Sequence, residues 1–296
     1  MIYDISLAID YEYAAASDRA RTLMRLLPSD LSGEQRVLDT ALTITPRPDE
    51  RREERDFFGN CTTTAVWHGP IDALHLVLKL RVERLTPPRS ADLSPLLADL
   101  PGTLDGVRDL GPCAPHHFRG PSARVPLIPA ISRFAQAVIT KAGGTPTTRQ
   151  AIELLGHALH EEMRFDAEAT SVETGPEQAF EQRSGVCQDF AHIMIAGLRA
   201  LGIPAGYVSG FLRTNPPPGQ PRLEGVDAMH AWVCAWAGPV TGWIEFDPTN
   251  DQPAGQDYVT VARGRDYLDA APVLGAMRSA GGQASRHAVD MVPLED

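Results

Sequence analysis

The chain has 296 residues, 43% of them hydrophobic, and a net charge of -11, which suits two globular domains or one large one. This acidic balance argues against nucleic acid and an anionic membrane surface as partners, because both require clustered lysine and arginine. The N-terminus lacks the basic segment of a signal peptide, and no run of about 18 apolar residues occurs, so we expect no membrane-spanning helix.

The first 105 residues carry the signals of β-strands separated by turns. Apolar side chains alternate from Ile2 to Tyr13, and segments rich in β-forming residues follow at 36–45, 61–68 and 73–84. Strands at this hairpin spacing predict an antiparallel β-sandwich-like N-terminal domain over residues 1–105. Residues 15–27 fit either a short helix or a bulged strand.

Prolines and glycines are frequent from residue 86 to 129, and the apolar periodicity there is weak. We interpret residues 106–128 as a linker that packs on the surface. His116 and His117 lie in this linker. Because no third ligand is near in sequence, we expect solvated loop histidines rather than a metal site.

Helical periodicity begins near Pro129, and residues 129–296 are assigned to the second domain. A second helix follows the capping threonines that end at Thr148. It carries His157 and His160, three positions apart, and no carboxylate or cysteine pattern completes a metal site with them. We expect these two histidines to pack or to face solvent.

The tail beyond Asp251 is rich in glycine and alanine. It predicts one short strand near residues 259–262 and mainly surface structure from 271 to 285. The chain contains no internal repeat.

Cys187 stands in the first turn of an amphipathic helix, directly after a glycine turn. Free backbone N–H groups and the positive end of the helix dipole stabilise an anion at this position, which favours a reactive thiolate. The same N–H groups could receive an oxyanion. Asp189, in the same turn, is placed to cap the helix. The alternative is a small buried core cysteine.

His230 begins a predicted strand, 230–236, and Asp247 ends another, 242–247. A hairpin that pairs Trp236 with Thr241 would place His230 directly opposite Asp247, with Cβ atoms about 4.5–5.5 Å apart. The carboxylate could then hold one imidazole nitrogen while the other faces Cys187. The alternative is a strand-end histidine beside a turn carboxylate. The leading hypothesis is a catalytic triad of Cys187, His230 and Asp247.

The other cysteines, Cys61, Cys113 and Cys234, suit neither a zinc site nor a disulfide framework by their spacing. We therefore expect a reducing, cytoplasmic location and no cofactor or metal. Cys234 is expected to pack among tryptophans. His192 lies off the face of Cys187 on the same helix, so we expect a structural role for it.

Four segments resemble, in order, motifs of the bacterial transglutaminase-like proteins, and the resemblance covers residues 130–265. They are Gly185–His192, Arg199–Phe211, Asp227–Trp232 and Gly242–Asn250. The N-terminal part is similar to the β-rich region of many bacterial members. Its matching segments include Arg25–Pro28, Gly33–Arg36 and Asp56–Asn60. Gln188 and Gly206 stand where many relatives carry arginine.

The resemblance implies an α+β fold, in which a papain-like transglutaminase core packs a nucleophile helix on an antiparallel sheet. It implies Cys187 as nucleophile, His230 as acid and base, and Asp247 as the residue that orients the histidine. The family's chemistry is attack on an amide or peptide carbonyl to give a thioester, which water or an amine resolves. A member is therefore a protease, an amidase or a transamidase.

The expected partner is a protein or peptide substrate, while its identity, the acceptor and the oligomeric state do not follow from the sequence. The alternative function is a catalytically inactive interaction module that keeps the fold. The loop 214–226, with its three consecutive prolines, is expected to cover the cleft and select substrates.

Overall fold

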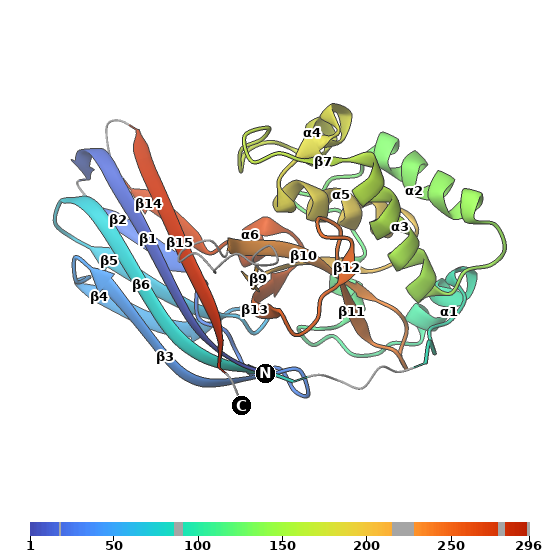
Figure 1. Cartoon of the computed structure of the whole chain (residues 1–296), viewed down its shortest axis with the longest axis horizontal. Helices are drawn as coiled ribbons and strands as arrows, with labels where there is room; N and C mark the ends of the chain where they lie inside the picture. The colour runs from blue at the N-terminus through green and yellow to red at the C-terminus, as the bar shows by residue number, and fades with distance from the viewer. Residues whose placement is uncertain (18, 86–90, 215–227, 278–281, 295–296) are drawn as a thin grey trace, which may run out of the picture.

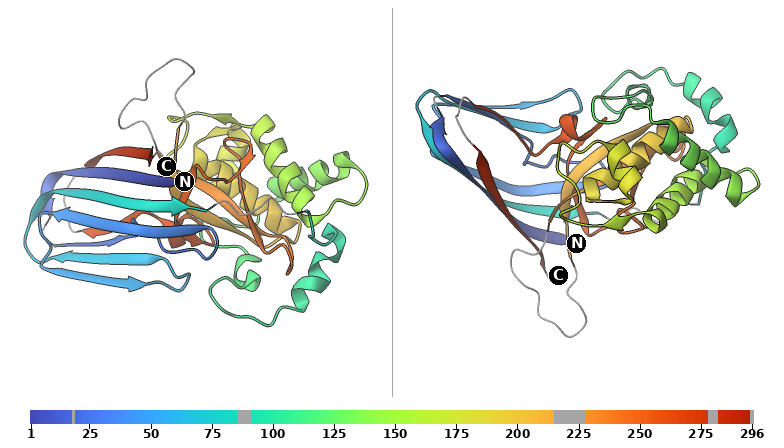
Figure 2. Two further views of the ribbon diagram at one scale, coloured as in Figure 1. Left: turned by 60° about the horizontal axis from the view of Figure 1, so that its bottom comes forward. Right: turned by 90° about the horizontal axis from the view of Figure 1, so that it is seen from above.

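A computed structural model describes residues 1–17, 19–85, 91–214, 228–277 and 282–294. It places a β-sandwich beside an α+β core (Figure 1). A five-stranded antiparallel sheet, here called the core sheet, lies between the sandwich and the main helices (Figures 1 and 2). The predicted α+β class, with an antiparallel β-rich N-terminal part, is confirmed.

The sandwich consists of two four-stranded sheets, in the orders β15-β1-β6-β3 and β14-β2-β5-β4. The strands are β1 (Ile2–Ser17), β2 (Ala20–Met24), β3 (Gln35–Thr45), β4 (Glu50–Arg55), β5 (Cys61–Trp67), β6 (Ile71–Arg84), β14 (Val273–Met277) and β15 (Gln283–Leu294). Neighbouring strands in both sheets pair antiparallel.

The strand β6 shows why this sequence forms a sandwich. Alternate side chains from Leu74 to Val82 are buried, and those between them face outward. This period of two gives each sheet one apolar face. The segment 15–27 is strand rather than helix: β1 continues to Ser17 through an irregular register after Glu12, and β2 follows.

The domain limits differ from the expected ones in two places. β14 pairs with β2 and β15 pairs with β1, so residues 273–277 and 283–294 complete the sandwich. The tail pattern was weak because β15 buries only Val289 and Met291 among its described side chains. At the other limit, α1 (Leu100–Asp105) contributes two buried leucines to the core cluster of the helices.

The expected linker is also more buried than a surface segment. Phe118, Val125 and Ile128 are each at most 4% exposed. Phe118 packs edge-on against Trp243 of the core sheet. Val125 and Ile128 belong to the core cluster of the helices, so the end of this segment packs into the core rather than on the surface.

The core sheet has the order β12-β11-β10-β9-β13. Its strands are β9 (Ala205–Leu212), β10 (Ala228–Trp236), β11 (Trp243–Asp247), β12 (Gln252–Pro253) and β13 (Tyr258–Gly264). The helices that pack near it are α2 (Pro129–Ala142), α3 (Thr148–Glu162), α4 (Pro176–Gln182), α5 (Cys187–Ala200) and α6 (Tyr267–Ala270).

The helix α5 is the central helix of the core. All its residues from Gln188 to Arg199 are buried, because α2, α3 and α4 contact it on one side and β10 and β9 on the other. Its first residue, Cys187, is half-buried. The helix therefore holds the cysteine at a fixed place above the sheet while leaving the thiol partly accessible.

Candidate active site

Cys187 is the first residue of α5, and two local contacts fix the start of this helix. The carboxylate of Asp189 accepts the backbone N–H of Val186 at 2.9 Å and the hydroxyl of Thr170 at 2.6 Å. A Cβ on Gly185 would come within 2.5 Å of that carboxylate, so the close approach requires glycine. The N–H groups of Asp189 and Phe190 donate to the carbonyl of Val186 at 2.9 and 3.2 Å. Those of Cys187 and Gln188, the first two of the helix, have no preceding turn of helix to supply a carbonyl.

Asp189 itself is 1% exposed. Burial raises the pKa of this carboxyl, although the hydrogen bonds from Thr170 and Val186 oppose the rise. Its function in the structure is to cap α5, as its position in the first turn predicts.

His230 and Asp247 come from the neighbouring strands β10 and β11. Nε2 of His230 lies 2.7 Å from Oδ2 of Asp247, and both side chains are buried. The predicted pairing of these two residues directly across the hairpin is wrong. β10 and β11 pair Trp236 with Trp243 and Val233 with Phe246, two positions from the expected register.

The register differs because the connection is longer than expected. Residues 237–242 close the hairpin, and Gly238 and Gly242 both adopt positive φ in it. A shift of two positions keeps each side chain on the same face of the sheet. His230 therefore reaches Asp247 along a diagonal of the strand pair rather than straight across it.

The carboxylate of Asp247 is 0% exposed and accepts five hydrogen bonds from the residues that the structure describes. Oδ2 accepts hydrogen bonds from Nε2 of His230, from the side-chain amide of Asn250 at 2.7 Å and from the hydroxyl of Tyr258 at 2.8 Å. Oδ1 receives the backbone N–H groups of Thr249 at 2.8 Å and Asn250 at 3.3 Å. These hydrogen bonds offset the free-energy cost of removing the ionised carboxylate from water.

The electrostatics of the site favour a protonated histidine. Burial lowers the pKa of His230, but hydrogen bonds with Asp247 and Cys187 and their charges outweigh it and raise the pKa to about 10. Burial raises the pKa of Asp247, and the bonds with His230, Asn250 and Tyr258 outweigh it, so that pKa is lowered. With Nε2 committed to Asp247, Nδ1 is the ring nitrogen available to Cys187.

Two residues of this site had no role in the sequence-based hypothesis. Asn250 lies 3.4 Å from Nε2 of His230 as well as touching Asp247. It stands in the segment Gly242–Asn250, so its proximity to Asp247 in sequence was a usable signal. Tyr258 comes from β13, on the other edge of the sheet, and nothing local in the sequence connects it to Asp247.

His192, the two histidines of α3 and Cys234 have other partners than His230. His192 is buried in α5, where its Nε2 accepts the backbone N–H of Tyr267 at 3.2 Å. His157 bonds the side chain of Asp251, and His160 bonds the carbonyl of Thr249. Both histidines of α3 thus support the turn that carries Asn250. Cys234 is buried beside Trp232.

His116 bonds the carbonyl of Val107 and His117 bonds that of Leu110, and both side chains belong to half-buried residues. Over the described residues, no group of three or more His, Cys, Asp and Glu side chains could hold a metal ion. Over the same residues, no helix has the length and apolar character to cross a membrane. The loop 214–226, expected to cover the cleft, lies outside the described residues except for Thr214.

The sequence matches known families in both of its parts. Residues 133–248 match the family described as the Transglutaminase-like superfamily, and residues 3–83 match the Bacterial transglutaminase-like N-terminal region. An uncharacterized protein of Mycobacterium tuberculosis is 32% identical over 314 residues, covering 99% of this chain and 93% of that protein.

Two further similarities are more limited. A stretch of 83 residues is 40% identical to a protein-glutamine gamma-glutamyltransferase of Pseudomonas aeruginosa, covering 27% of this chain and 12% of that protein. Among solved structures, a candidate cysteine protease from Cytophaga hutchinsonii superposes with a TM-score of 0.73 at 22% identity. That superposition covers 100% of this chain and 91% of the other and concerns the fold.

Proposed function

The chain belongs to the transglutaminase-like superfamily, and from this premise we propose that it is a cysteine-dependent acyl-transfer enzyme. Its substrate is an amide or peptide carbonyl, and the acyl group passes through a thioester on Cys187. His230 is the acid and base, and Asp247 orients it. The substrate class is protein or peptide.

The observation that carries this proposal is the buried 2.7 Å contact between Asp247 and His230, together with the interaction of His230 with Cys187. A carboxylate that is fully buried and held by five donors is costly unless it has a specific partner. Here its partner is an imidazolium, and the half-buried thiol interacts with the same ring. An imidazolium beside a cysteine favours the thiolate, which is the nucleophilic form.

The first half of the reaction follows from this arrangement. The Cys187 thiolate attacks the carbonyl carbon, and the carbonyl oxygen becomes an oxyanion that the N–H groups at the start of α5 stabilise. Nδ1 of His230 then gives its proton to the leaving amine as the C–N bond breaks. The product of this half is a thioester and a neutral imidazole.

In the second half, the neutral imidazole accepts a proton from water or from an acceptor amine as it attacks the thioester. The C–S bond breaks, and the thiolate and imidazolium are restored. Water gives a protease or amidase, and an amine gives a transamidase. The partial similarity to a glutamyltransferase makes a side-chain carboxamide the first donor to try.

The test is competitive labelling of the four cysteines with iodoacetamide near neutral pH, read by mass spectrometry. Cys187 should react at least about tenfold faster than Cys113 because only its thiolate has an imidazolium partner. Cys113 is the matched control, since it is more exposed and lies outside the network. Equal labelling of the two would reject the proposal and favour an inactive interaction module.

A thioester-forming acyl probe then tests the chemistry itself. The probe should acylate the wild type at Cys187, fail with Cys187→Ala and react normally with Cys113→Ser. Adding a primary amine separates the two outcomes, since amide product indicates transamidation and free acid indicates hydrolysis. Absence of acylation in the wild type would contradict an acyl-transfer function.

A further inference from the structure

β13 is an edge strand of the core sheet, and side chains of the sandwich cover its outer edge. The inner edge of β13 pairs with β9. An uncovered outer edge would leave backbone N–H and C=O groups without partners in a buried place. Gln35 and Asn60 supply the missing hydrogen bonds.

Gln35 pairs with Thr260 as a second peptide group would. Its Nε2 donates to the carbonyl of Thr260 at 2.9 Å, and its Oε1 accepts the N–H of Thr260 at 2.9 Å. Gln35 is 2% exposed and Thr260 3%. Both bonds are therefore sheltered from water, where breaking them leaves buried polar groups unsatisfied.

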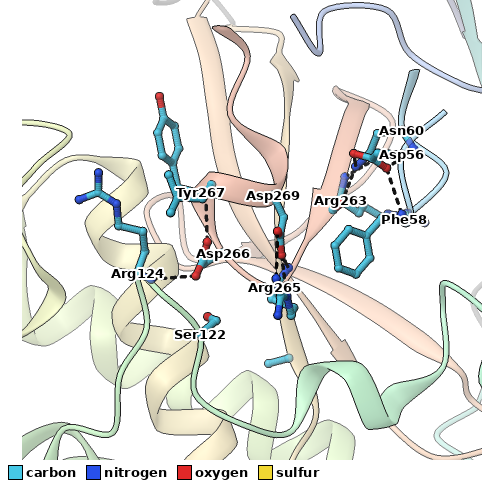
Figure 3. Close-up of polar contacts among 12 residues, drawn as sticks. Asp56, Phe58, Asn60, Ser122, Arg124, Arg263, Arg265, Asp266, Tyr267 and Asp269 are labelled. Atoms are coloured by element: carbon cyan, nitrogen blue, oxygen red, sulfur yellow. Dashed lines mark hydrogen bonds and ion pairs between the residues drawn. The ribbon is translucent and has the colours of Figure 1, made fainter. Parts of the chain in front are cut away.

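Asn60 makes the same pair of hydrogen bonds with Arg263, three residues further along the strand. Its Oδ1 accepts the N–H of Arg263 at 2.8 Å, and its Nδ2 donates to the carbonyl of Arg263 at 2.8 Å. Nδ2 also reaches Asp56, which pairs with Arg25 at 2.9 Å. Figure 3 shows Asp56 and Asn60 grouped beside Arg263. The hydrogen bonds between Asn60 and Arg263 thus assign a structural role to the segments Arg25–Pro28 and Asp56–Asn60.

A bulge in β13 makes both contacts possible. In a regular strand, backbone groups that point to one edge recur every second residue. Thr260 and Arg263 are three apart, and the pairing with β9 shifts between Thr260 and Ala262. The extra residue turns the backbone of Arg263 to the same outer edge as that of Thr260.

Other contacts join the same strand to the sandwich. Val259 and Val261 lie in the apolar cluster of the sandwich. The hydroxyl of Tyr3 donates to Asp257, the residue before β13, at 3.0 Å. The Arg263 side chain bonds Glu34 of the sandwich and Glu245 of β11, at 2.9 and 2.6 Å.

We propose that the sandwich positions Asp247, the carboxylate that orients His230, through β13. Gln35 and Asn60 are positioning residues that fix the strand, so that its first residue, Tyr258, places its hydroxyl 2.8 Å from Oδ2 of Asp247. Asp247 in turn holds His230. This inference rests on the proposed function, because it assigns the sandwich a part in that same site.

The test measures alkylation of Cys187 by iodoacetate against pH, with iodoacetamide as the neutral reference. The iodoacetate anion is attracted to the His230 imidazolium, so the ratio of the two rates falls as His230 loses its proton. In Tyr258→Phe, Gln35→Ala and Asn60→Ala, this fall should move to lower pH by about one unit, because a less well held carboxylate stabilises the imidazolium less.

The control for general destabilisation is Leu78→Ala, which removes a fully buried apolar side chain of the sandwich that forms none of the hydrogen bonds to β13. It should lower the urea midpoint without moving the profile. Gln35→Ala added to Tyr258→Phe should move the profile no further, because both changes act through one hydroxyl.

The outcomes separate the two proposals. A wild type whose rate ratio does not change with pH rejects the proposed function itself. A wild type with the expected profile, alongside Gln35→Ala and Asn60→Ala profiles that match that of Leu78→Ala, rejects the positioning role alone. If the alanine variants do not fold, Tyr3→Phe removes only the hydroxyl bonded to Asp257, and an unmoved profile in it counts against the proposal.

Discussion

His230 and Asp247 are joined by a 2.7 Å hydrogen bond that runs along a diagonal of the β10–β11 pair. The carboxylate has four other donors, and its position depends on the 249–250 turn and on β13 as well as on its own strand. The alignment of the histidine is thus a property of three separate parts of the core.

Replacing Asp247 by Asn should reduce turnover by about 10³–10⁴-fold. The amide keeps the shape of the side chain but loses the charge that raises the pKa of His230. Stability should also fall by about 1–3 kcal/mol, since the amide NH₂ must face one of the donors that Asp247 accepts. Steady-state kinetics and urea unfolding measure the two effects, and near-normal turnover in a folded variant would exclude the triad.

The same pair gives an alkaline signature. The pKa of His230 is raised to about 10, so its contribution to stability is complete below the unfolded value of about 6.5 and is lost as pH rises toward 10. Urea midpoints of the wild type should fall across this range. Those of Asp247→Asn should fall much less, and parallel curves would show that the pair does not couple to folding.

Asn250→Ala should lower kcat by about 10–100-fold, the equivalent of losing one hydrogen bond to a charged group. Thr249→Val is the matched control, because the hydroxyl of Thr249 has no partner among the described residues while its backbone N–H still reaches Asp247. The alkaline limb of the kcat–pH profile should move to lower pH in Asn250→Ala but not in Thr249→Val. Equal changes in both would indicate a general effect of the turn.

His192 should make the protein sensitive to acid. Burial lowers the pKa of His192 to about 4, and its Nε2 accepts the Tyr267 N–H in the neutral form. Between about pH 6.5 and 4 the unfolded chain binds a proton that the folded chain does not. The free energy of unfolding therefore decreases by up to about 3 kcal/mol as the pH is lowered through this range. His192→Gln should flatten this part of the curve, and an unchanged slope would refute the assignment.

Gly156→Ala should destabilise the core by about 1–3 kcal/mol. A Cβ there would lie 2.2 Å from the ring of Phe246, the neighbour of Asp247 on β11. Gly102→Ala in α1 is the control, because its Cβ would meet nothing within 4 Å. Chemical denaturation compares the two, and a neutral Gly156→Ala would mean that Phe246 can move without cost.

The parts of the site that sequence predicted are those with a local signature. Cys187 follows a glycine turn, His230 begins a strand and Asp247 ends one, and each lies in its own short motif. The exact strand register was not predictable, because two glycines with positive φ extend the hairpin connection. The contact between His230 and Asp247 is nevertheless correctly predicted, because a register shift of two positions keeps both side chains on the same face of the sheet.

The contacts between distant segments were beyond such reasoning. Gln35 and Thr260 are 225 positions apart, and a side chain that imitates a peptide group leaves no periodic pattern in sequence. β15 was missed for a related reason. Most of its described side chains are exposed, so its pairing with β1 depends on backbone groups that every residue has.

That pairing of β1 with β15, from Ile2 opposite Leu294 to Tyr13 opposite Gln283, cannot form until residues 283–294 have left the ribosome. A nascent chain that has not yet released residues 273–294 already contains Cys187, His230 and Asp247. It also has one unpaired edge on β1 and another on β2. Unpaired strand edges promote association with other chains. We therefore expect the chain to be most prone to aggregation before these two strands are paired.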